Sequence, residues 1–340
     1  MQLTTHPFEL PLRHVFTISR GSVRVQSTLI VELTDGTHRG YGEATTNPYY
    51  GATIEHMTGA LESLQPLLAP VDQIEPEQLW QQAAARLRDN SFARCALDEA
   101  AHDLWGKQQG APLTKLWGLD TTDCPVSNYT IGIDSIETMI AKMREVPDWP
   151  IYKIKLGTSH DLEIIRQLRA HTEARFRVDA NCGWSAEETI ANSHQLKALG
   201  VEFIEQPLPA DDIEGSRRVF QQSALPIIAD ESCVHEADIP RCHGLFHGVN
   251  IKLVKCGGLT PARRMIDQAR ALEMRVMVGC MTESTVGISA IAQLLPLLDY
   301  VDMDGAALLA RDIATGSRLE NGRCLFAEGN GTGVELVSSG

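Results

Sequence analysis

Eight short apolar runs that alternate with amphipathic stretches are the feature that most limits how this chain can fold. The runs occupy residues 127–133, 151–157, 176–181, 201–207, 226–232, 249–255, 275–280 and 300–305. Between them, apolar residues recur at the three- and four-residue steps of helices, for example in 161–173, 185–200 and 261–274. Buried strands that alternate with helices predict a parallel sheet. Eight such units favour closure of this sheet into an α/β barrel. A doubly wound open sheet is the alternative, and it is less favoured because no strand is followed by a GxGxxG turn.

The residues before this alternation have a different composition. Residues 10–44 are rich in β-branched residues, and Asp35-Gly36 marks a tight hairpin turn between antiparallel strands. Helical patterns follow in 52–68 and 92–110, and a strand-rich run followed by a helix-rich run is typical of a small α+β domain. We therefore expect three parts: an α+β domain at 1–122, the barrel at 123–315, and a C-terminal segment at 316–340 that packs back on the first domain.

Charge and cysteine content limit the partners and the compartment. The net charge of −14 and the pI of about 5.2 argue against nucleic acids and anionic membranes as partners, because both require a basic protein surface. No run reaches the roughly 18 apolar residues of a membrane span, and the first residues lack the basic and apolar regions of a secretory signal. The eight cysteines stand singly, without CxxC spacing, which predicts reduced thiols and a cytoplasmic protein. A homo-oligomer is compatible with these features.

Acidic residues stand at the carboxyl ends of three successive predicted strands, where the active-site groups of α/β barrels lie. They are Asp179, Glu205 and Asp230. Buried charge is costly unless it is paired, and three converging anions require a cation. Oxygen ligands without histidine or cysteine favour Mg²⁺ over zinc or iron. We therefore predict a Mg²⁺ site at these carboxylates, although each one taken singly also fits a solvated strand end or a helix N-cap.

Lysines form the second half of the pattern. Lys153 and Lys155 share one side of the second predicted strand because side chains alternate, and Lys252 ends the sixth, on the opposite side of a closed barrel. A partly desolvated lysine near a metal and other cations has a lowered pKa and can act as a base. Two opposed bases suit a reaction that removes a proton from one face of a carbon and returns one to the other face. Lys107 and Lys255, in contrast, are interpreted as ordinary surface lysines.

These motifs together resemble the enolase superfamily, in its muconate-lactonizing subgroup. The resemblance covers nearly the whole chain and rests on KIK at 153–155, DAN at 179–181, EQP at 205–207, DES at 230–232 and KLVKCGG at 252–258. It implies an α/β fold made of a modified (β/α)8-type barrel with an N-terminal α+β capping domain. It also implies bound Mg²⁺ and a lysine base, the combination with which this superfamily stabilises an enediolate.

Within the subgroup, the chain resembles dipeptide epimerases of the L-Ala-D/L-Glu type. The resemblance implies that Asp302 and Asp304, at the end of the eighth strand, hold the ammonium of a dipeptide, with Thr130 as a further substrate-binding residue. Arg20 lies where these enzymes have a loop over the substrate, and a guanidinium there can clamp a side-chain carboxylate. A turn-capping Asp304 and a solvent-facing Arg20 are the alternatives for these two residues.

The reaction implied by the resemblance inverts the α-carbon of the second residue of a dipeptide. The C-terminal carboxylate binds Mg²⁺, and either Lys155 or Lys252 removes the α-proton. Mg²⁺ and Lys153 stabilise the resulting enediolate, and the opposite lysine returns a proton. Murein peptides are the implied source of the substrate.

Other functions stay open. An N-acylamino-acid racemase, an o-succinylbenzoate synthase or a cycloisomerase would share the lysines and carboxylates but would not require Asp302 together with Asp304. A Schiff-base aldolase would use one lysine as a nucleophile and would leave the three carboxylates unexplained. A catalytically silent peptide-binding barrel would keep the acidic pair and Arg20 but would have no need of two opposed lysines.

Overall fold

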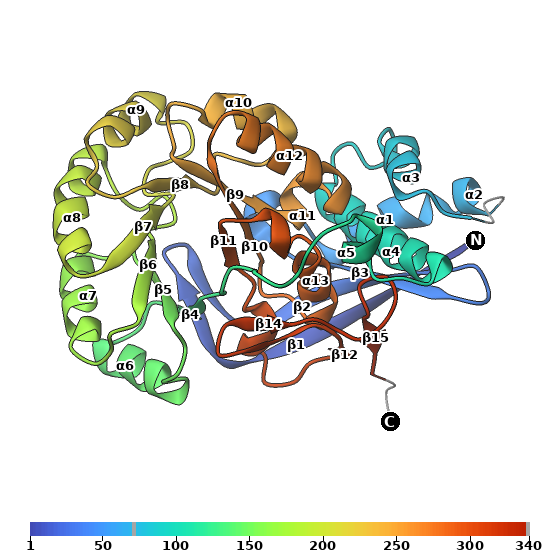
Figure 1. The fold of residues 1–340 in the computed structure, drawn as a ribbon, viewed down its shortest axis with the longest axis horizontal. Helices are drawn as coiled ribbons and strands as arrows, with labels where there is room; N and C mark the ends of the chain where they lie inside the picture. Colours follow the sequence, from blue (N-terminus) through green and yellow to red (C-terminus); the bar gives the residue numbers. More distant parts are fainter. Residues whose placement is uncertain (70–72, 338–340) are drawn as a thin grey trace.

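A parallel sheet of eight strands, bent nearly into a closed barrel, is the main feature of the computed structural model, which describes residues 1–69 and 73–337 (Figure 1). Its strands are β4 (Tyr129–Ile131), β5 (Ile151–Lys155), β6 (Arg175–Asp179), β7 (Val201–Glu205), β8 (Ile227–Ala229), β9 (Gly248–Lys252), β10 (Arg275–Gly279) and β11 (Tyr300–Asp302). They follow one another in sequence order, each parallel to the next. A parallel bridge between Ser127, just before β4, and Val301 of β11 connects the two ends of the sheet. The predicted α/β barrel is therefore confirmed.

Most of the helices between the strands form an outer layer around the barrel (Figure 1). The helices that follow the barrel strands are α6 (Ile136–Glu145), α7 (Asp161–Arg169), α8 (Ala186–Ala198), α9 (Ile213–Gln222), η2 (Glu236–Asp238), α10 (Ile239–Cys242), α11 (Leu253–Cys256), α12 (Leu259–Ala271), α13 (Thr285–Ala292), η3 (Leu295–Leu297) and η4 (Gly305–Leu308). In α7, Ile164, Ile165 and Leu168 are buried, as helical spacing of apolar residues predicts. Among residues 1–69 and 73–337, no helix combines the length and the apolar character that a membrane crossing requires.

All eight predicted runs extend past the ends of their strands, and two of these differences affect selected residues. The apolar run 249–255 is a strand only as far as Lys252, since the chain enters the short helix α11 at Leu253. The run 300–305 is a strand only as far as Asp302, and Asp304 precedes the turn η4. Apolar patterning missed both ends because the residues that follow each strand are also buried.

An antiparallel sheet in the order β1–β2–β3, with helices packed against it, forms the N-terminal part. The elements are β1 (Gln2–Ile18), β2 (Gly21–Thr34), β3 (Arg39–Thr45), η1 (Pro48–Tyr50), α1 (Ile54–Glu62), α2 (Gln65–Leu68), α3 (Pro76–Ala83), α4 (Ser91–Gln109) and α5 (Leu113–Leu116). At the predicted turn, the Asp35 side chain accepts two backbone hydrogen bonds from the residues that follow. Gly40 and Gly42 allow α4 to lie close to β3, because a Cβ at either position would collide with the backbone of α4. The predicted α+β architecture is thus present.

The C-terminal residues return to helix α4. They contain β12 (Ala314–Thr315), β13 (Arg318–Glu320), β14 (Arg323–Leu325) and β15 (Glu335–Leu336). Thr332 donates its backbone N–H and its hydroxyl to Asp103 of α4, at 2.8 and 2.9 Å. Lys107 Nζ lies 3.0 Å from Asp103 Oδ2 and donates to the carbonyl of Val334. The interpretation of Lys107 as a surface lysine is therefore wrong, because its side chain is 11% exposed and joins α4 to this segment.

The predicted division of the chain at residues 122 and 315 stays a prediction. Residues 338–340 of the predicted C-terminal segment lie outside the described residues.

Three buried glutamates lie where the N-terminal sheet contacts the barrel: Glu43 of β3, Glu99 of α4 and Glu283 before α13. Glu43 accepts hydrogen bonds from the backbone N–H and hydroxyl of Ser284 and from the backbone N–H of Gly287, so it caps the N-terminus of α13. Glu99 accepts a hydrogen bond from the backbone N–H of Glu43. Burial raises the pKa of all three carboxyls, to about 8 for Glu283. Burial therefore favours the protonated forms of these acids at the contact between the two parts.

Replacing Glu283 by Gln is expected to reduce the pH dependence of stability. The folded protein holds a proton on Glu283 up to about pH 8, whereas the unfolded chain releases it near the usual pKa of 4.5. Folding stability in the wild type should therefore fall as pH rises between these values, by up to about 1.4 kcal/mol per pH unit from this group. Urea unfolding at pH 5 to 8 should show a shallower decline for Glu283→Gln. The exposed Glu328→Gln serves as the control, and equal slopes for all three proteins would contradict the prediction.

Candidate active site

Three carboxylates converge at the mouth of the barrel. The parallel register pairs Asp179 at the end of β6 with Glu205 at the end of β7, and Asp230 directly follows β8. All three side chains are buried. Each offers one oxygen, and these three oxygens lie within 4.8 Å of one another. The structure thus brings together the acids that the sequence analysis selected.

This group of carboxylates fits a hard divalent cation. Its three members offer only carboxylate oxygens, the ligands that Mg²⁺ prefers. Burial raises the pKa of Glu205 to about 7, and Asp179 and Asp230 add to this rise while Lys153 opposes it. A cation placed among the three would relieve their mutual repulsion.

The two predicted bases lie on opposite sides of this group. Lys155 of β5 donates to Asp179 at 2.6 Å, and Lys252 of β9 donates to Asp230 at 2.9 Å. Around the barrel, β6 to β8 separate β5 from β9 in one direction, and β4, β11 and β10 separate them in the other. The two ammonium groups therefore approach the carboxylates from opposite walls of the barrel.

The pKa of Lys252 lies above its usual value among the side chains alone, and its predicted lowering beside a metal stays a prediction. Burial, the largest single effect, lowers this pKa, but the attraction of Asp230 and Glu205 together outweighs it, and the net shift is upward. The direct pairing of Lys252 with Asp230 is a contact that the local sequence does not show.

Lys153 connects the carboxylate group to the acidic pair after β11. Its Nζ lies 2.7 Å from Glu205 Oε2, 2.7 Å from Asp302 Oδ2 and 3.3 Å from Asp179 Oδ2. The side chain is 1% exposed, and the attraction of these acids outweighs burial, so the pKa of Lys153 is well above its usual value. Lys153 is therefore a fixed positive charge at the base of the site.

Lys255 is not a surface lysine, contrary to its interpretation from sequence. It is fully buried in α11. Its Nζ donates to Asp230 Oδ1 at 2.6 Å and to the carbonyl of Cys233 at 2.8 Å. Since Lys252 reaches the other oxygen of Asp230, the two lysines together fix the orientation of this carboxylate. The error arose because 249–255 was treated as one strand, whereas the helix turns Lys255 back towards β8.

Asp302 and Asp304 lie beside each other on the far side of Lys153. The Asn128 side chain donates to Asp302 at 2.7 Å, and the backbone N–H of Thr130 donates to Asp304. Burial, reinforced by the charge of Asp302, raises the pKa of Asp304 to about 8. Asp302 already has Lys153 as a counter-ion. Asp304 is therefore the member of the pair that can form a further ion pair with a bound cation.

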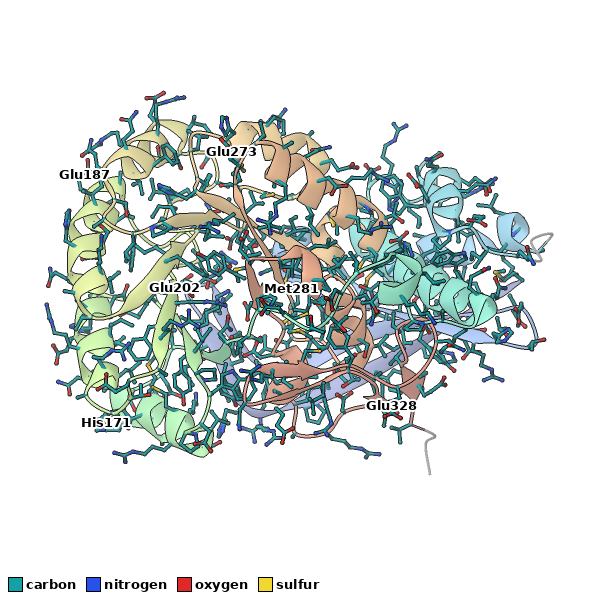
Figure 2. The ribbon with its side chains drawn as sticks, in the orientation of Figure 1. His171, Glu187, Glu202, Glu273, Met281 and Glu328 are labelled. Carbon is teal, nitrogen blue, oxygen red and sulfur yellow. The ribbon has the colours of Figure 1, made fainter. Side chains whose placement is uncertain are left out.

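These groups open into one cavity of about 550 Å³ between the barrel mouth and the N-terminal sheet. The lining includes Lys155, Lys252, Asp302, Asp304 and Thr130 from the barrel, and Phe16, Ile18, Tyr49 and Tyr50 from the N-terminal part. Met281 also lines it and lies near the centre of Figure 2, whereas Glu187 and His171 lie at the outer rim of the barrel. A single open cavity thus contains the two opposed lysines and the acidic pair.

Arg20 lies at the tip of the β1–β2 hairpin, which extends to the barrel mouth (Figure 1). It lines the cavity, where the sequence analysis placed it. Its guanidinium is 2.7 Å from Glu231 Oε1 and donates to the carbonyl of Asn181 at 3.1 Å. The charge of Arg20 is therefore already paired within the protein.

Several polar residues that hold the site in place were not selected from the sequence. Asn250 donates to Glu205 at 2.8 Å, and Arg177 donates to the side chain of Asn128 at 3.2 Å. A signal was available for two of them. Asn250 stands two residues before Lys252, and Arg177 stands two residues before Asp179, so strand alternation places each on the same face as a selected residue.

Mg²⁺ should stabilise the wild-type protein, and loss of any one of the three carboxylates should weaken this effect. Binding to the folded state alone contributes about 2.7 kcal/mol at a hundredfold excess over Kd. We expect thermal unfolding with added Mg²⁺ to shift upward for the wild type and far less for Asp179→Asn, Glu205→Gln or Asp230→Asn. The exposed Asp120→Asn controls for the loss of one negative charge. A variant with the full wild-type shift would show that its residue is not a ligand.

The chain matches known proteins over nearly its whole length. Residues 2–118 match the family described as mandelate racemase / muconate lactonizing enzyme, N-terminal domain, and residues 137–339 match enolase C-terminal domain-like proteins. An L-Ala-D/L-amino acid epimerase of Flavobacterium johnsoniae is 55% identical over 337 residues, which cover 99% of this chain and 100% of that protein. An L-Ala-D/L-Glu epimerase of Bacteroides thetaiotaomicron is 38% identical, over 99% of this chain and 88% of that protein.

A solved structure shows the same likeness. The dipeptide epimerase from Cytophaga hutchinsonii, complexed with Mg and the dipeptide D-Ala-L-Val, has a TM-score of 0.93 at 26% identity, covering 99% of this chain and 96% of that chain. The predicted family is confirmed: the chain belongs to the enolase superfamily, with the N-terminal and barrel domains of its mandelate racemase and muconate lactonizing enzymes.

Proposed function

We propose that this protein is a Mg²⁺-dependent dipeptide epimerase that inverts the α-carbon of the second residue. The observation that carries the proposal is the placement of Lys155 and Lys252 on opposite sides of one buried carboxylate group. The acidic pair in the same cavity supports a substrate with a free ammonium. The relative with 55% identity is named for epimerisation of L-Ala-D/L-amino acids, which agrees with this chemistry.

Asp179, Glu205 and Asp230 would hold the Mg²⁺ ion. When bound, Mg²⁺ neutralises a substrate carboxylate and so makes the adjacent α-proton more acidic. The buried Lys153 supplies a second positive charge at the base of the site, where negative charge develops as the proton leaves.

Lys155 Nζ and Lys252 Nζ perform the proton transfers. One of them takes the α-proton from one face of the carbon, and the other donates a proton to the opposite face, which inverts the configuration. The roles exchange for the other epimer, because each lysine faces one side of the carbon.

The acidic pair recognises the amino terminus of the substrate. A desolvated ammonium requires anionic partners, and Asp304 together with Asp302 provides them near Thr130. This feature favours a dipeptide epimerase over an N-acylamino-acid racemase, an o-succinylbenzoate synthase or a cycloisomerase. The two opposed lysines likewise favour an enzyme over a peptide-binding barrel that lacks activity.

The biological setting is part of the proposal. All eight cysteines are free, which supports a reducing cytoplasm as the place of action. Dipeptides from murein, including the Ala–Glu type, are among the proposed substrates. Exposed Val15, Val23 and Val25 on the β1–β2 hairpin support assembly with a second copy of the chain.

Incubation of dipeptides with the enzyme and Mg²⁺ in D₂O tests the proposal. One deuteron should enter the α-carbon of the second residue, and the other epimer should appear. Lys155→Ala and Lys252→Ala should each reduce epimerisation by about 10²–10⁴-fold or more, while each retains exchange from one epimer. The exposed Lys197→Ala is the matched control. Normal epimerisation by either active-site variant would contradict the two-base assignment.

N-acetylation of the dipeptide should greatly lower kcat/KM. The modification removes the charge of the ammonium that Asp302 and Asp304 are proposed to bind, and hydrogen bonds between charged groups are about twice as strong as neutral ones. Steady-state rates with free and N-acetylated L-Ala-L-Met measure the effect. Equal rates would contradict a dipeptide epimerase and would favour an N-acylamino-acid racemase.

A further inference from the structure

Two lysines hold the two carboxylate oxygens of Asp230. Lys255 Nζ donates to Oδ1 at 2.6 Å, and Lys252 Nζ donates to Oδ2 at 2.9 Å. The backbone of the same loop is fixed separately, because the side chain of Gln206 accepts hydrogen bonds from the backbone N–H groups of Asp230 and Ser232. The loop is therefore held by Gln206, and the carboxylate is oriented by the two lysines.

These two lysines differ in how firmly they are held. Besides Asp230 Oδ1, Lys255 donates to the carbonyl of Asp230 at 2.5 Å and to the carbonyl of Cys233 at 2.8 Å. All three N–H donors of its ammonium are therefore used, and its side chain is fully buried. Lys252, in contrast, lines the cavity and has its ion pair with Asp230. Lys252 can therefore leave this carboxylate more readily than Lys255 can.

A Mg²⁺ ion at the proposed site would take the Asp230 oxygen that Lys252 now holds. A divalent ion and an ammonium on one buried oxygen repel each other strongly, so the ion must displace the lysine whose oxygen it binds. Binding to Oδ1 would displace Lys255 from a buried position with three hydrogen bonds. Binding to Oδ2 would displace only Lys252, which borders the cavity. Oδ2 is therefore the expected ligand atom.

We propose that Lys255 is a positioning residue that keeps the base Lys252 free when Mg²⁺ is bound. This inference deepens the proposed epimerase function, on which it rests. Lys255 occupies Oδ1 and Mg²⁺ occupies Oδ2, so Asp230 has no oxygen left to hold Lys252. Lys252 can then face the substrate in the cavity. Without the ammonium of Lys255, Oδ1 would be open to Lys252, which would stay paired with Asp230 beside the bound ion.

A crystal structure of the wild type with Mg²⁺ and without substrate tests this exchange of partners directly. We expect Asp230 to bind the ion through Oδ2 alone while Lys255 keeps Oδ1. Lys252 Nζ should then lie beyond about 4 Å, the limit of an ion pair, from both oxygens. Bidentate binding by Asp230, displacement of Lys255, or a Lys252 that stays paired with Asp230 would overturn the inference. This measurement needs neither a variant nor turnover.

Lys255→Met should impair proton removal from one epimer selectively. The readout is α-deuterium exchange of L-Ala-L-Met and of L-Ala-D-Met in D₂O with saturating Mg²⁺. Lys252→Ala first identifies the epimer that Lys252 deprotonates, because exchange of that epimer is lost. In Lys255→Met, exchange of the same epimer should fall about 10–100-fold, while exchange of the other epimer should change by less than about threefold. General destabilisation or weaker Mg²⁺ binding would instead lower both rates together.

Lys142→Met is the matched control. Lys142 is likewise a buried lysine paired with an acid, since its side chain is 8% exposed and its Nζ lies 3.0 Å from Asp134 Oδ2. This variant should keep the wild-type ratio of the two exchange rates. An unchanged ratio in Lys255→Met, or an equal loss for both epimers, would overturn the inference. Turnover by the wild type tests the epimerase function separately, and the Mg²⁺-bound structure decides the inference even if Lys255→Met does not fold.

Discussion

The barrel mouth is stabilised by charge balance among side chains that are all buried. Acids and lysines interleave there: Asp179, Glu205, Asp230 and Asp302 with Lys153, Lys155, Lys252 and Lys255. A buried charge that loses its partner costs several kcal/mol, so none of these groups is independent of the others. A divalent cation that binds the acids must compete with lysines for the same oxygens, and its binding therefore changes the surroundings of the two proposed bases. Metal binding and the positions of the two proposed bases therefore depend on the same set of buried charges.

The regular geometry of the barrel places these charged side chains next to one another. Parallel register pairs Lys155 with Asp179, and Asp179 with Glu205, in consecutive strands. Lys153 and Lys155 point the same way because the strand repeats every two residues. The N-terminal sheet then closes the cavity from outside and is fixed to the barrel by the Glu43 cap on α13. Rigid strands thus hold the charged groups, and a separate part of the chain provides the apolar cover.

Local sequence patterns predicted what depends on strand alternation, and they failed where the partner of a residue is remote. The eight strands and the converging acids follow from runs of apolar residues that end in charge. Lys255 could not be placed, because its position depends on a helical turn that apolar patterning does not distinguish from a strand. Lys107 and Arg20 have partners more than 200 residues away in the sequence, Val334 and Glu231 respectively, and no local pattern specifies such contacts. The sequence shows that a side chain is charged, but it does not show which residue pairs with that charge.

The closure of the barrel has a consequence for how such an enzyme can change during evolution. The first and last strands are joined by the Ser127–Val301 bridge, by Asn128 with Asp302, and by Thr130 with Asp304. The residues that would recognise the substrate's amino terminus therefore also connect the two ends of the sheet. Substitutions at these residues would destabilise the whole barrel. The tip of the β1–β2 hairpin is not part of the barrel, so substitutions there would affect its stability less. Diversification among descendants of this fold should consequently be slow for the first residue of the dipeptide and rapid for the second.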